Sequence, residues 1–423
     1  MTENFTETRF TVTIFGASKQ KPVIIENNSI THFTFIEDVF NALPLAILEF
    51  VDRSGLIEAV PIIGREMVSI MYGDDTVSNK SSSVHKTWNF FTYDINFKTE
   101  ITNTGSGVTT VIMKLVDPRY VTMNFTRFSR SWKNKTGSEI IKSICTYMVG
   151  GGQEATFDKW EDSFGYIGPY IDVDKNIQSF IMPYWTPLET IRWLLKRMEG
   201  NNQFPGYLFY TSGKGFNLVT FAHLIDISKN SVESKKYFFM TSDKDMYFSE
   251  NRILNWKLYP PSNSALSYIP GGTCMSPRFD TKEMRERSRL LSETYEEYKN
   301  IVHGSQPLYP TDINNATSTV FSYGGDYIVL NCIFGNEWIK KYMNQLQMQI
   351  LVKGRPDRYA GMLIDIEWPA LKSSMQNEMY NGRYLVKSIE HIFEPAAQPQ
   401  YKQMIRILKT GYKDTVAGGA LGQ

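Results

Sequence analysis

Apolar residues alternate with polar residues in segments near both ends of this chain. Near the N-terminus, Phe10, Val12 and Ile14 are separated by threonines, and residues 91–97 repeat the pattern with aromatic and aliphatic side chains. Near the C-terminus, residues 382–412 read as two strands around a loop of Pro, Ala and Gln. A period of two is typical of strands that are buried on one face. The pattern therefore predicts a fold dominated by β-sheet.

Composition supports this interpretation and limits the function. Aromatic residues make up 14% of the 423 residues, and aromatic side chains pack well on pleated surfaces. The net charge is +1, so the chain lacks the basic excess expected of a protein that coats DNA. The three cysteines, Cys145, Cys274 and Cys332, are too sparse for a disulfide framework and fit a reducing cytoplasm.

Neither a secretion signal nor a membrane anchor is expected. The first residues, MTENFTETRF, contain no apolar core of the kind that a signal peptide needs. No apolar run approaches the roughly 20 residues of a membrane-spanning helix. We therefore expect a soluble protein.

Helix start signals occur in the middle of the chain. Thr136 stands three residues before Glu139, which is the spacing of a capping box. The segment 186–189, Thr-Pro-Leu-Glu, combines an N-cap threonine, a proline at the first helical position and a glutamate at the third. Asp117-Pro118 reads as a turn and a domain boundary, with a short strand expected from about 121 to 128. Two capped helices therefore interrupt the strands.

The segment 280–302 predicts a third, strongly charged helix with one apolar stripe. Two interpretations remain open for it: a solvated face of a small subdomain, or an interaction helix at a partner surface. A further helical stretch is expected around 337–347. Residues 413–423 are small and read as a flexible tail.

Signatures of catalysis are weak in this sequence. It contains no GxxxxGK[ST], GxGxxG or HExxH motif, and glycines 150–152 follow a helix, where glycine marks a stop. The five histidines show no metal-ligand spacing. Acidic pairs such as 74–75 lie in loop-like stretches, where solvated charge explains them more simply than a glycosidase site. We therefore predict no enzymatic activity, no cofactor and no metal site.

Two segments near the C-terminus resemble a known family. Residues 352–363, VKGRPDRYAGML, place two glycine turns between strands, and residues 382–391, GRYLVKSIEH, continue as an alternating strand. Both are similar to elements of myophage baseplate central hub proteins, which hold the cell-puncturing spike. More distantly, they resemble late-control D proteins and the base of VgrG spikes. The resemblance covers most of the chain by element order, but by motif only residues 350–412. The charged segment 281–300 and the long loop that runs to Tyr380 depart from the family pattern.

The resemblance implies a β-rich α+β fold with two tail-tube-like β-barrels and helical and small insertions. The first barrel domain would comprise residues 1–117 plus about 205–260. The second, with helices, would comprise 118–204 plus about 315–412. Residues 261–314 would form an inserted small helical subdomain. From its position alone, the flexible tail 413–423 is expected to contact the spike.

The resemblance also implies a structural function. Three copies of such a hub form a ring of pseudo-sixfold symmetry that connects the tail tube to the central spike. The partners would be the other copies of the homotrimer, the spike protein, the tail tube protein or a tube-initiating ring, other baseplate proteins, and DNA passing through the lumen. The chain would be assembled in the host cytoplasm and reside in the virion tail baseplate. The alternatives are a tail-associated carbohydrate-active or cell-wall-degrading enzyme, and another tail component such as a distal-tail adaptor.

Candidate residues for the barrel core or the ring interface come from strands of both barrels. They are Phe91, Tyr93, Ile95 and Phe97 in the first barrel, and Tyr384, Val386, Ile405 and Ile407 in the second.

Overall fold

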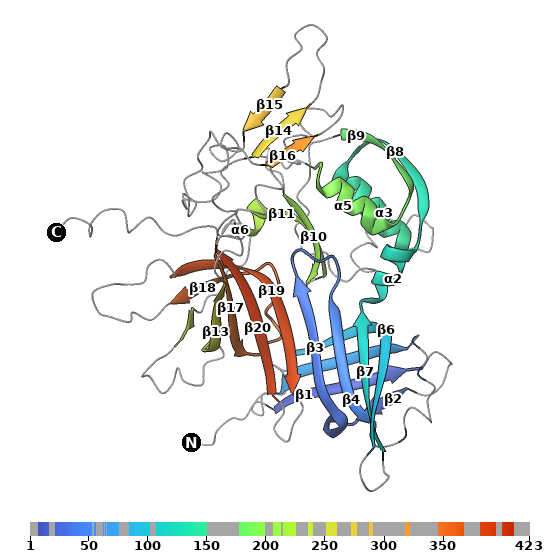
Figure 1. Cartoon of the computed structure of the whole chain (residues 1–423), viewed down its shortest axis with the longest axis vertical. Coiled ribbons are helices and arrows are strands. Elements are labelled where there is room, and N and C mark those ends of the chain that lie inside the picture. The colour runs from blue at the N-terminus through green and yellow to red at the C-terminus, as the bar shows by residue number, and fades with distance from the viewer. Residues whose placement is uncertain are drawn as a thin grey trace, which may run out of the picture.

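The structure of the chain, a computed structural model, is dominated by β-strands, as the alternating segments predict (Figure 1). It describes residues 7–16, 22–52, 55, 62, 64, 66–75, 84–101, 107–149, 177–198, 206–212, 215–225, 236–239, 251–259, 272–276, 287–290, 318–321, 346–367, 381–394 and 400–409. Within these ranges, no helix is both long and apolar enough to cross a membrane. A sheet of 13 strands forms the body of the molecule.

The N-terminal half of this sheet is an antiparallel array in the order β3-β4-β7-β6-β5-β1-β2. Its strands are β1 (Glu7–Phe15), β2 (Val23–Ile25), β3 (Ile30–Asp38), β4 (Leu45–Asp52), β5 (Met67–Asp75), β6 (Val84–Ile101) and β7 (Gly107–Val116), with a 3-10 turn η1 (Asn27–Ser29) before β3. Its core is rich in fully buried aromatic rings, including Phe33, Phe35, Phe50 and Phe90. Each such side chain contributes about 1.5–3 kcal/mol by leaving water.

The C-terminal half continues the sheet in the order β13-β17-β20-β19. Its strands are β12 (Tyr237–Phe238), β13 (Ile253–Tyr259), β17 (Leu346–Lys353), β18 (Leu363–Glu367), β19 (Gly382–Glu394) and β20 (Gln400–Lys409). Strand β18 pairs with β19 and, in parallel, with β12. A second core of aliphatic residues lies in this half. Strand β13 falls within residues 205–260, which the sequence assigned to the first barrel, but it pairs with β17.

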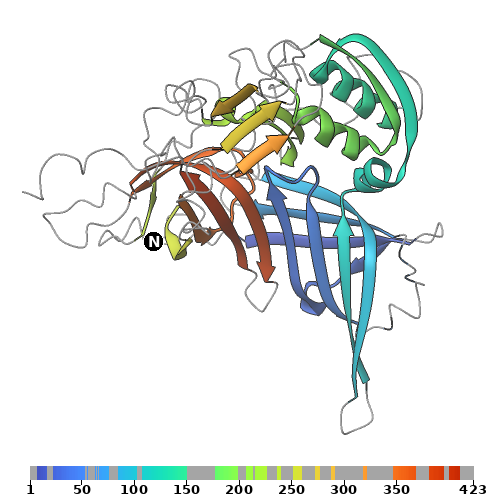
Figure 2. The same ribbon diagram turned by 45° about the horizontal axis from the view of Figure 1, so that its top comes forward.

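The two halves are joined at one seam, where β3 pairs antiparallel with β19 and Phe35 faces His391. Figure 2 shows the halves side by side beneath the helical subdomain. Among the described strands, the path of the sheet is open, with β13 at one end and β2 at the other. The molecule therefore has two hydrophobic cores on one continuous sheet.

A helical subdomain follows β7 and encloses a third core. It comprises α2 (Pro118–Phe125), β8 (Phe128–Thr136), α3 (Gly137–Val149), β9 (Ile177–Trp185), α5 (Pro187–Leu195), β10 (Tyr207–Ser212), β11 (Gly215–Thr220) and α6 (Phe221–Ile225). Both predicted capping boxes are confirmed. The Glu189 amide donates to the Thr186 hydroxyl at 3.3 Å, while the Glu189 carboxylate accepts from the Thr186 amide at 2.8 Å. The same reciprocal pair joins Thr136 and Glu139.

The strand predicted for about 121–128 is wrong, because residues 118–125 form helix α2. The Asp117 carboxylate accepts a hydrogen bond from the Arg119 amide at 2.9 Å, and Pro118 occupies the first helical position. Asp followed by Pro is therefore an N-cap signal at this place. It was interpreted as a turn.

The helix predicted for 280–302, and with it the helical subdomain 261–314, is wrong where the chain is described. Residues Arg287–Leu290 form strand β15 in a three-stranded sheet with β14 (Gly272–Ser276) and β16 (Ser318–Phe321). Pairing with a neighbouring strand overrides the local helix propensity. Apolar residues at helical spacing give no sign of such pairing. Of the helical stretch expected around 337–347, the described part, 346–347, begins β17. The tail 413–423 lies outside the described residues.

Candidate functional site

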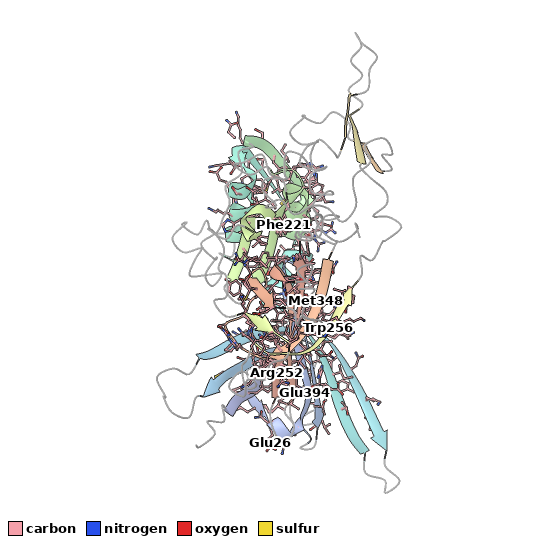
Figure 3. The ribbon with its side chains drawn as sticks, turned by 90° about the vertical axis from the view of Figure 1, so that its left-hand side faces the viewer. Glu26, Phe221, Arg252, Trp256, Met348 and Glu394 are labelled. Atoms are coloured by element: carbon pink, nitrogen blue, oxygen red, sulfur yellow. The ribbon has the colours of Figure 1, made fainter. Side chains whose placement is uncertain are left out.

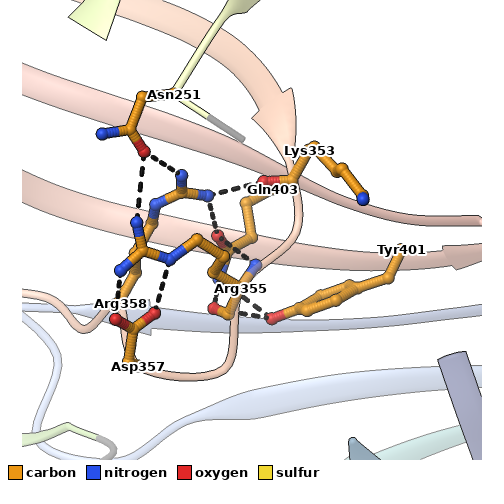
Figure 4. Close-up of polar contacts among 7 residues, drawn as sticks. All are labelled: Asn251, Lys353, Arg355, Asp357, Arg358, Tyr401 and Gln403. Carbon is orange, nitrogen blue, oxygen red and sulfur yellow. Dashed lines mark hydrogen bonds and ion pairs between the residues drawn. The ribbon is translucent and has the colours of Figure 1, made fainter. Parts of the chain in front are cut away.

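The loop between β17 and β18, residues 354–361, lies where both halves of the sheet and the helical subdomain meet. Its residues contact β3 of the N-terminal half, β20 of the C-terminal half and the segment that leads into β13. Figure 4 shows the polar contacts at its centre. The loop is part of the 352–363 segment that carries the family resemblance.

The loop begins with a close approach of backbone to an aromatic ring. The Gly354 amide donates to the Tyr401 carbonyl at 2.8 Å. A Cβ at Gly354 would lie 2.3 Å from two atoms of the Tyr401 ring. Only glycine fits at position 354, because the Tyr401 ring occupies the space that a Cβ would need.

Arg358 is the largest fully buried side chain of the described residues. Its guanidinium donates to the side-chain carbonyl of Gln403 at 2.8 Å, to that of Asn251 at 2.8 Å and to the Lys353 carbonyl at 2.5 Å (Figure 4). It also lies 5.3 Å from the ring centre of Tyr237. A buried charge is tolerated only when hydrogen bonds replace its water. Arg358 therefore fixes β13, β17 and β20 to one another.

A second arginine extends this network toward the surface. The Arg355 guanidinium binds both carboxylate oxygens of Asp357 and donates to the side-chain carbonyl of Asn251 at 3.2 Å. Burial alone would raise the pKa of Asp357, but the hydrogen bond and charge of Arg355 outweigh it and hold that pKa below its ordinary value. The Gln403 amide donates back to the Arg355 carbonyl at 2.7 Å.

Aromatic stacking continues the network across the seam. The Tyr401 hydroxyl lies 2.7 Å from Nδ1 of His391 and accepts from the Gln403 amide at 2.9 Å. The His391 ring stacks on Phe35 of β3, with centroids 4.0 Å apart and planes at 7°. Tyr401 in turn stacks on Phe393 at 4.4 Å. The histidine therefore joins the two halves as a packed core residue.

The end of the 354–361 loop contacts both β3 and the helical subdomain. The Ala360 amide donates to the buried Glu37 carboxylate of β3 at 3.3 Å. Gly361, at φ +94°, faces the Tyr210 hydroxyl of β10 so closely that a Cβ would lie 2.2 Å from it. Burial, together with Tyr359 and Glu37, raises the pKa of Tyr210, so this phenol stays neutral. The Thr211 hydroxyl also donates to the Ala42 carbonyl at 2.7 Å.

This arrangement provides rigidity. The buried Arg358 guanidinium is occupied by the side-chain carbonyls of Asn251 and Gln403, and the partly exposed Arg355 pairs with Asp357. Among the described residues, no group of His, Cys, Asp and Glu could hold a metal ion. We call the network of Glu37, Asn251, Arg355, Arg358, His391, Tyr401 and Gln403 the seam lock.

The candidate residues of the C-terminal half come together in one core. Tyr384 and Val386 of β19 and Ile405 and Ile407 of β20 are all buried in the second cluster. Val386 and Ile407 are directly opposite each other in the ladder. They hold β19 against β20.

The candidates on β6 are split by a β-bulge between Thr92 and Asp94. Before the bulge Phe90 faces the core and Phe91 is half-buried on the opposite face, whereas after it Ile95 packs against the first core. Tyr93 is 58% exposed and meets Tyr120 of α2 edge to face, and Phe97 is 49% exposed. Tyr93 and Phe97 are therefore not part of the buried core, and a place for them at a ring interface stays a prediction.

The residues of the seam lock were not predicted individually. The 352–363 segment pointed to the loop, but its partners Glu37 and Asn251 lie far away in the sequence. The five histidines show no metal-ligand spacing in the sequence, and His391 is a buried strand residue that bonds to Tyr401. Buried polar side chains carry no periodic signal of their own, so only the three-dimensional arrangement reveals them.

No family model matches the sequence, and no curated protein matches it. Solved structures are similar over nearly the whole chain. The tail protein from Neisseria meningitidis MC58 is 8% identical, with 94% of this chain and 96% of that chain covered and a TM-score of 0.56. The 43 kDa tail protein of prophage MuSo2 from Shewanella oneidensis is 10% identical, with 95% and 99% covered and a TM-score of 0.56.

A chain of the Francisella PdpA-VgrG complex in its half-lidded form is also similar. It is 10% identical, with 96% of this chain and 58% of that chain covered and a TM-score of 0.50. At such identities the likeness concerns the fold. The chain therefore has the fold that tail proteins and a chain of a VgrG complex share, and the seam lock lies at the centre of that fold.

Proposed function

We propose that this chain is the structural baseplate hub of a contractile phage tail. The observation that carries the proposal is the end-to-end similarity to two tail proteins, which covers at least 94% of every chain compared. The partial likeness to a chain of a VgrG complex supports a role beside a spike. The family resemblance of residues 352–363 and 382–391 points in the same direction.

In this proposal the two cores belong to two tube-like barrel units of one chain. The first cluster lies within β1–β7 and also takes in Phe393 of β19 and Tyr401 of β20. The second cluster lies within the C-terminal half of the large sheet. Three chains would then place six similar units in a ring that matches a sixfold tube on one side and a threefold spike on the other. The seam lock would hold the two units of each chain at a fixed angle, so that the ring closes.

Open sheet ends support assembly with further copies. Strands β2 and β13 end the sheet, and both expose large apolar side chains, Ile24 on β2 and Leu254 and Trp256 on β13. Exposed sheet edges are templates for pairing with another chain. Contacts between different surfaces of identical copies generate rings when the rotation closes.

The further partners in this proposal are the spike protein, the tail tube protein or a tube-initiating ring, other baseplate proteins, and DNA that passes through the lumen. The chain is assembled in the host cytoplasm and functions in the virion tail without catalysing a reaction. Residues 413–423 contact the spike. Deletion of these residues without loss of spike binding would remove this last point.

The mass of the purified chain in solution tests the proposal. We expect a homotrimer by sedimentation or mass photometry, and a complex when a spike protein expressed from the same tail gene cluster is added. Peptidoglycan digestion is measured on the same sample. A stable monomer that cleaves peptidoglycan would contradict the hub function and favour a cell-wall-degrading enzyme.

A further inference from the structure

Charge is divided between two surfaces of this nearly neutral chain. Residues 118–138, which span α2 and β8, contain five Lys or Arg residues and no Asp or Glu. Residues 22–52, which span β2, β3 and β4, contain five Asp or Glu residues and no Lys or Arg. The net charge of the whole chain is only +1. Acidic residues pair with the ends of the first stretch, Asp117 with Arg119 and Glu139 with Lys135. In the second stretch Glu37 is buried. The charges that define the two surfaces are therefore Arg127 and Lys133 on one and Glu26 and Glu49 on the other.

The basic surface also exposes apolar side chains. On the two-stranded ribbon β8–β9, Arg130, Lys133 and Lys135 lie beside β9, in which Ile181 is 73% exposed and Tyr184 is 64% exposed. The inward face of the same ribbon is occupied, because Trp132 stacks on buried Phe180. Arg130 shares this face, because its guanidinium lies 5.7 Å from the centre of the Trp132 ring. We call Arg127, Lys133, Lys135, Ile181 and Tyr184 the basic ribbon.

Backbone strain presents one of these rings to solvent. Tyr184 has φ +47°, a left-handed conformation that non-glycine residues rarely adopt. Its amide donates to the Ser129 hydroxyl on β8 at 3.0 Å, which holds the strained residue in place. Tyr184 lies at the irregularity where the β8–β9 register shifts between Phe128 and Arg130, and strained residues cluster at functional sites. We therefore interpret the exposed Tyr184 ring as a contact residue.

The acidic surface has complementary features. Glu26 follows β2, while Glu49 and Asp52 lie on β4 beside the 3-10 turn that precedes β3. Near these acidic residues Ile24 is 66% exposed and Ile47 is 43% exposed. We call Glu26, Glu49, Asp52, Ile24 and Ile47 the acidic strip. It offers negative charge and apolar area together, as the basic ribbon offers positive charge and apolar area.

We infer that the basic ribbon of one copy docks on the acidic strip of the next copy of this chain. The ribbon curls round the helices at one end of the molecule, and Glu26 lies toward the opposite end (Figures 1 and 3). The two surfaces differ, so the contact is head-to-tail, which is the kind that forms a ring. The inference rests on the proposed function and names the surfaces through which the ring assembles.

Nucleic acid is the other occupant that such a basic, aromatic ribbon could take. Contacts to phosphates need cations, but they make no use of an exposed isoleucine such as Ile181. A partner that supplies acidic and apolar groups matches both features of the ribbon. The chain itself carries that partner surface, which favours a second copy.

Charge reversal tests the inference on the full chain. One variant carries Arg127→Glu and Lys133→Glu in the ribbon, and another carries Glu26→Lys and Glu49→Lys in the strip. We expect each to raise the concentration needed for half-assembly by about tenfold or more, because like charges then face each other. A chain with all four substitutions restores attraction and should assemble nearly as the unchanged protein does. Lys353→Glu with Arg406→Glu, two exposed residues on the inner strands β17 and β20, is the matched control and should have little effect on assembly.

The outcomes separate this inference from the proposed function. A trimer that neither reversal weakens would overturn the inference and leave the hub function standing. A chain that is monomeric without any substitution would overturn both. Failure of the fourfold variant to reassemble, with circular dichroism showing it folded, would refute the pairing of these two surfaces. Loss of binding to a short DNA duplex in the ribbon variant, with assembly unchanged, would assign the ribbon to nucleic acid and overturn the inference.

Discussion

Substitution of Gly354 by alanine tests the packing of the seam lock. The new Cβ would lie 2.3 Å from Cγ and Cδ1 of Tyr401 and 2.6 Å from Cδ2. Carbon atoms in contact normally lie about 3.5–4.0 Å apart, so the ring would have to retreat by more than about 1 Å. Tyr401 cannot retreat freely, because it stacks on Phe393 at 4.4 Å and bonds to His391 and Gln403 through its hydroxyl.

The expected cost follows from these contacts. Overpacking of a dense core costs about 1–3 kcal/mol, and each hydrogen bond lost from Tyr401 adds about 1 kcal/mol. We therefore expect Gly354→Ala to lower the free energy of unfolding by about 2–4 kcal/mol. The measurement is chemical denaturation followed by circular dichroism, under conditions where unfolding is reversible.

A second glycine shows what backbone strain costs without a clash. Gly354 is not among the glycines with positive φ, so its substitution tests the clash alone. At Gly64, φ is +91° and no atom lies within 4 Å of an added Cβ, so Gly64→Ala should cost only the backbone term, about 1–2 kcal/mol. The clash itself is isolated by a double-mutant cycle with Tyr401→Ala. If Gly354→Ala destabilised the protein equally with and without the Tyr401 ring, or not at all, the reasoning would be refuted.

Three further perturbations test other parts of the structure. Arg358→Met keeps an unbranched side chain but removes the guanidinium that donates to Gln403, Asn251 and Lys353. Each buried acceptor left without a donor costs about 1–3 kcal/mol, so the substitution should cost about 3–5 kcal/mol in the same denaturation assay; a cost below about 1 kcal/mol would show that these hydrogen bonds do not stabilise the fold. Thr186→Ala removes an N-cap bond and should cost about 1 kcal/mol, whereas Thr186→Ser should be nearly neutral; equal costs would argue against the cap. Burial raises the pKa of the Cys145 thiol to about 12, so at mildly alkaline pH the thiol stays protonated and unreactive. With Cys274 and Cys332 replaced by serine, a thiol reagent should label Cys145 only after unfolding, and rapid labelling of the folded chain would contradict its burial.

Much of the fold could be predicted because residues close together in the sequence determine its strands and helix starts. The alternating segments at 10–14, 91–97 and 382–391 all lie in strands, and both capping boxes start the expected helices. Helix α2 was missed because Asp-Pro is compatible with both a turn and a cap, and only the chain beyond it decides. The bulge in β6 was missed because a period of two cannot register one inserted residue.

The seam lock could not be predicted for a different reason. Its contacts join Glu37 to Ala360 across 323 positions and Arg358 to Asn251 across 107. No local pattern links residues at such separations. The resemblance of residues 352–363 to a family pointed to this loop. A loop motif does not indicate which strands the loop contacts.

Electron microscopy of the assembled particle tests the central claim most directly. If three chains each contribute two sheet units, class averages should show threefold symmetry with six similar densities around a central lumen. Docking the chain into the map should then place the basic ribbon of one copy against the acidic strip of its neighbour. A particle of one chain, or a ring of six chains with strict sixfold symmetry, would contradict the account.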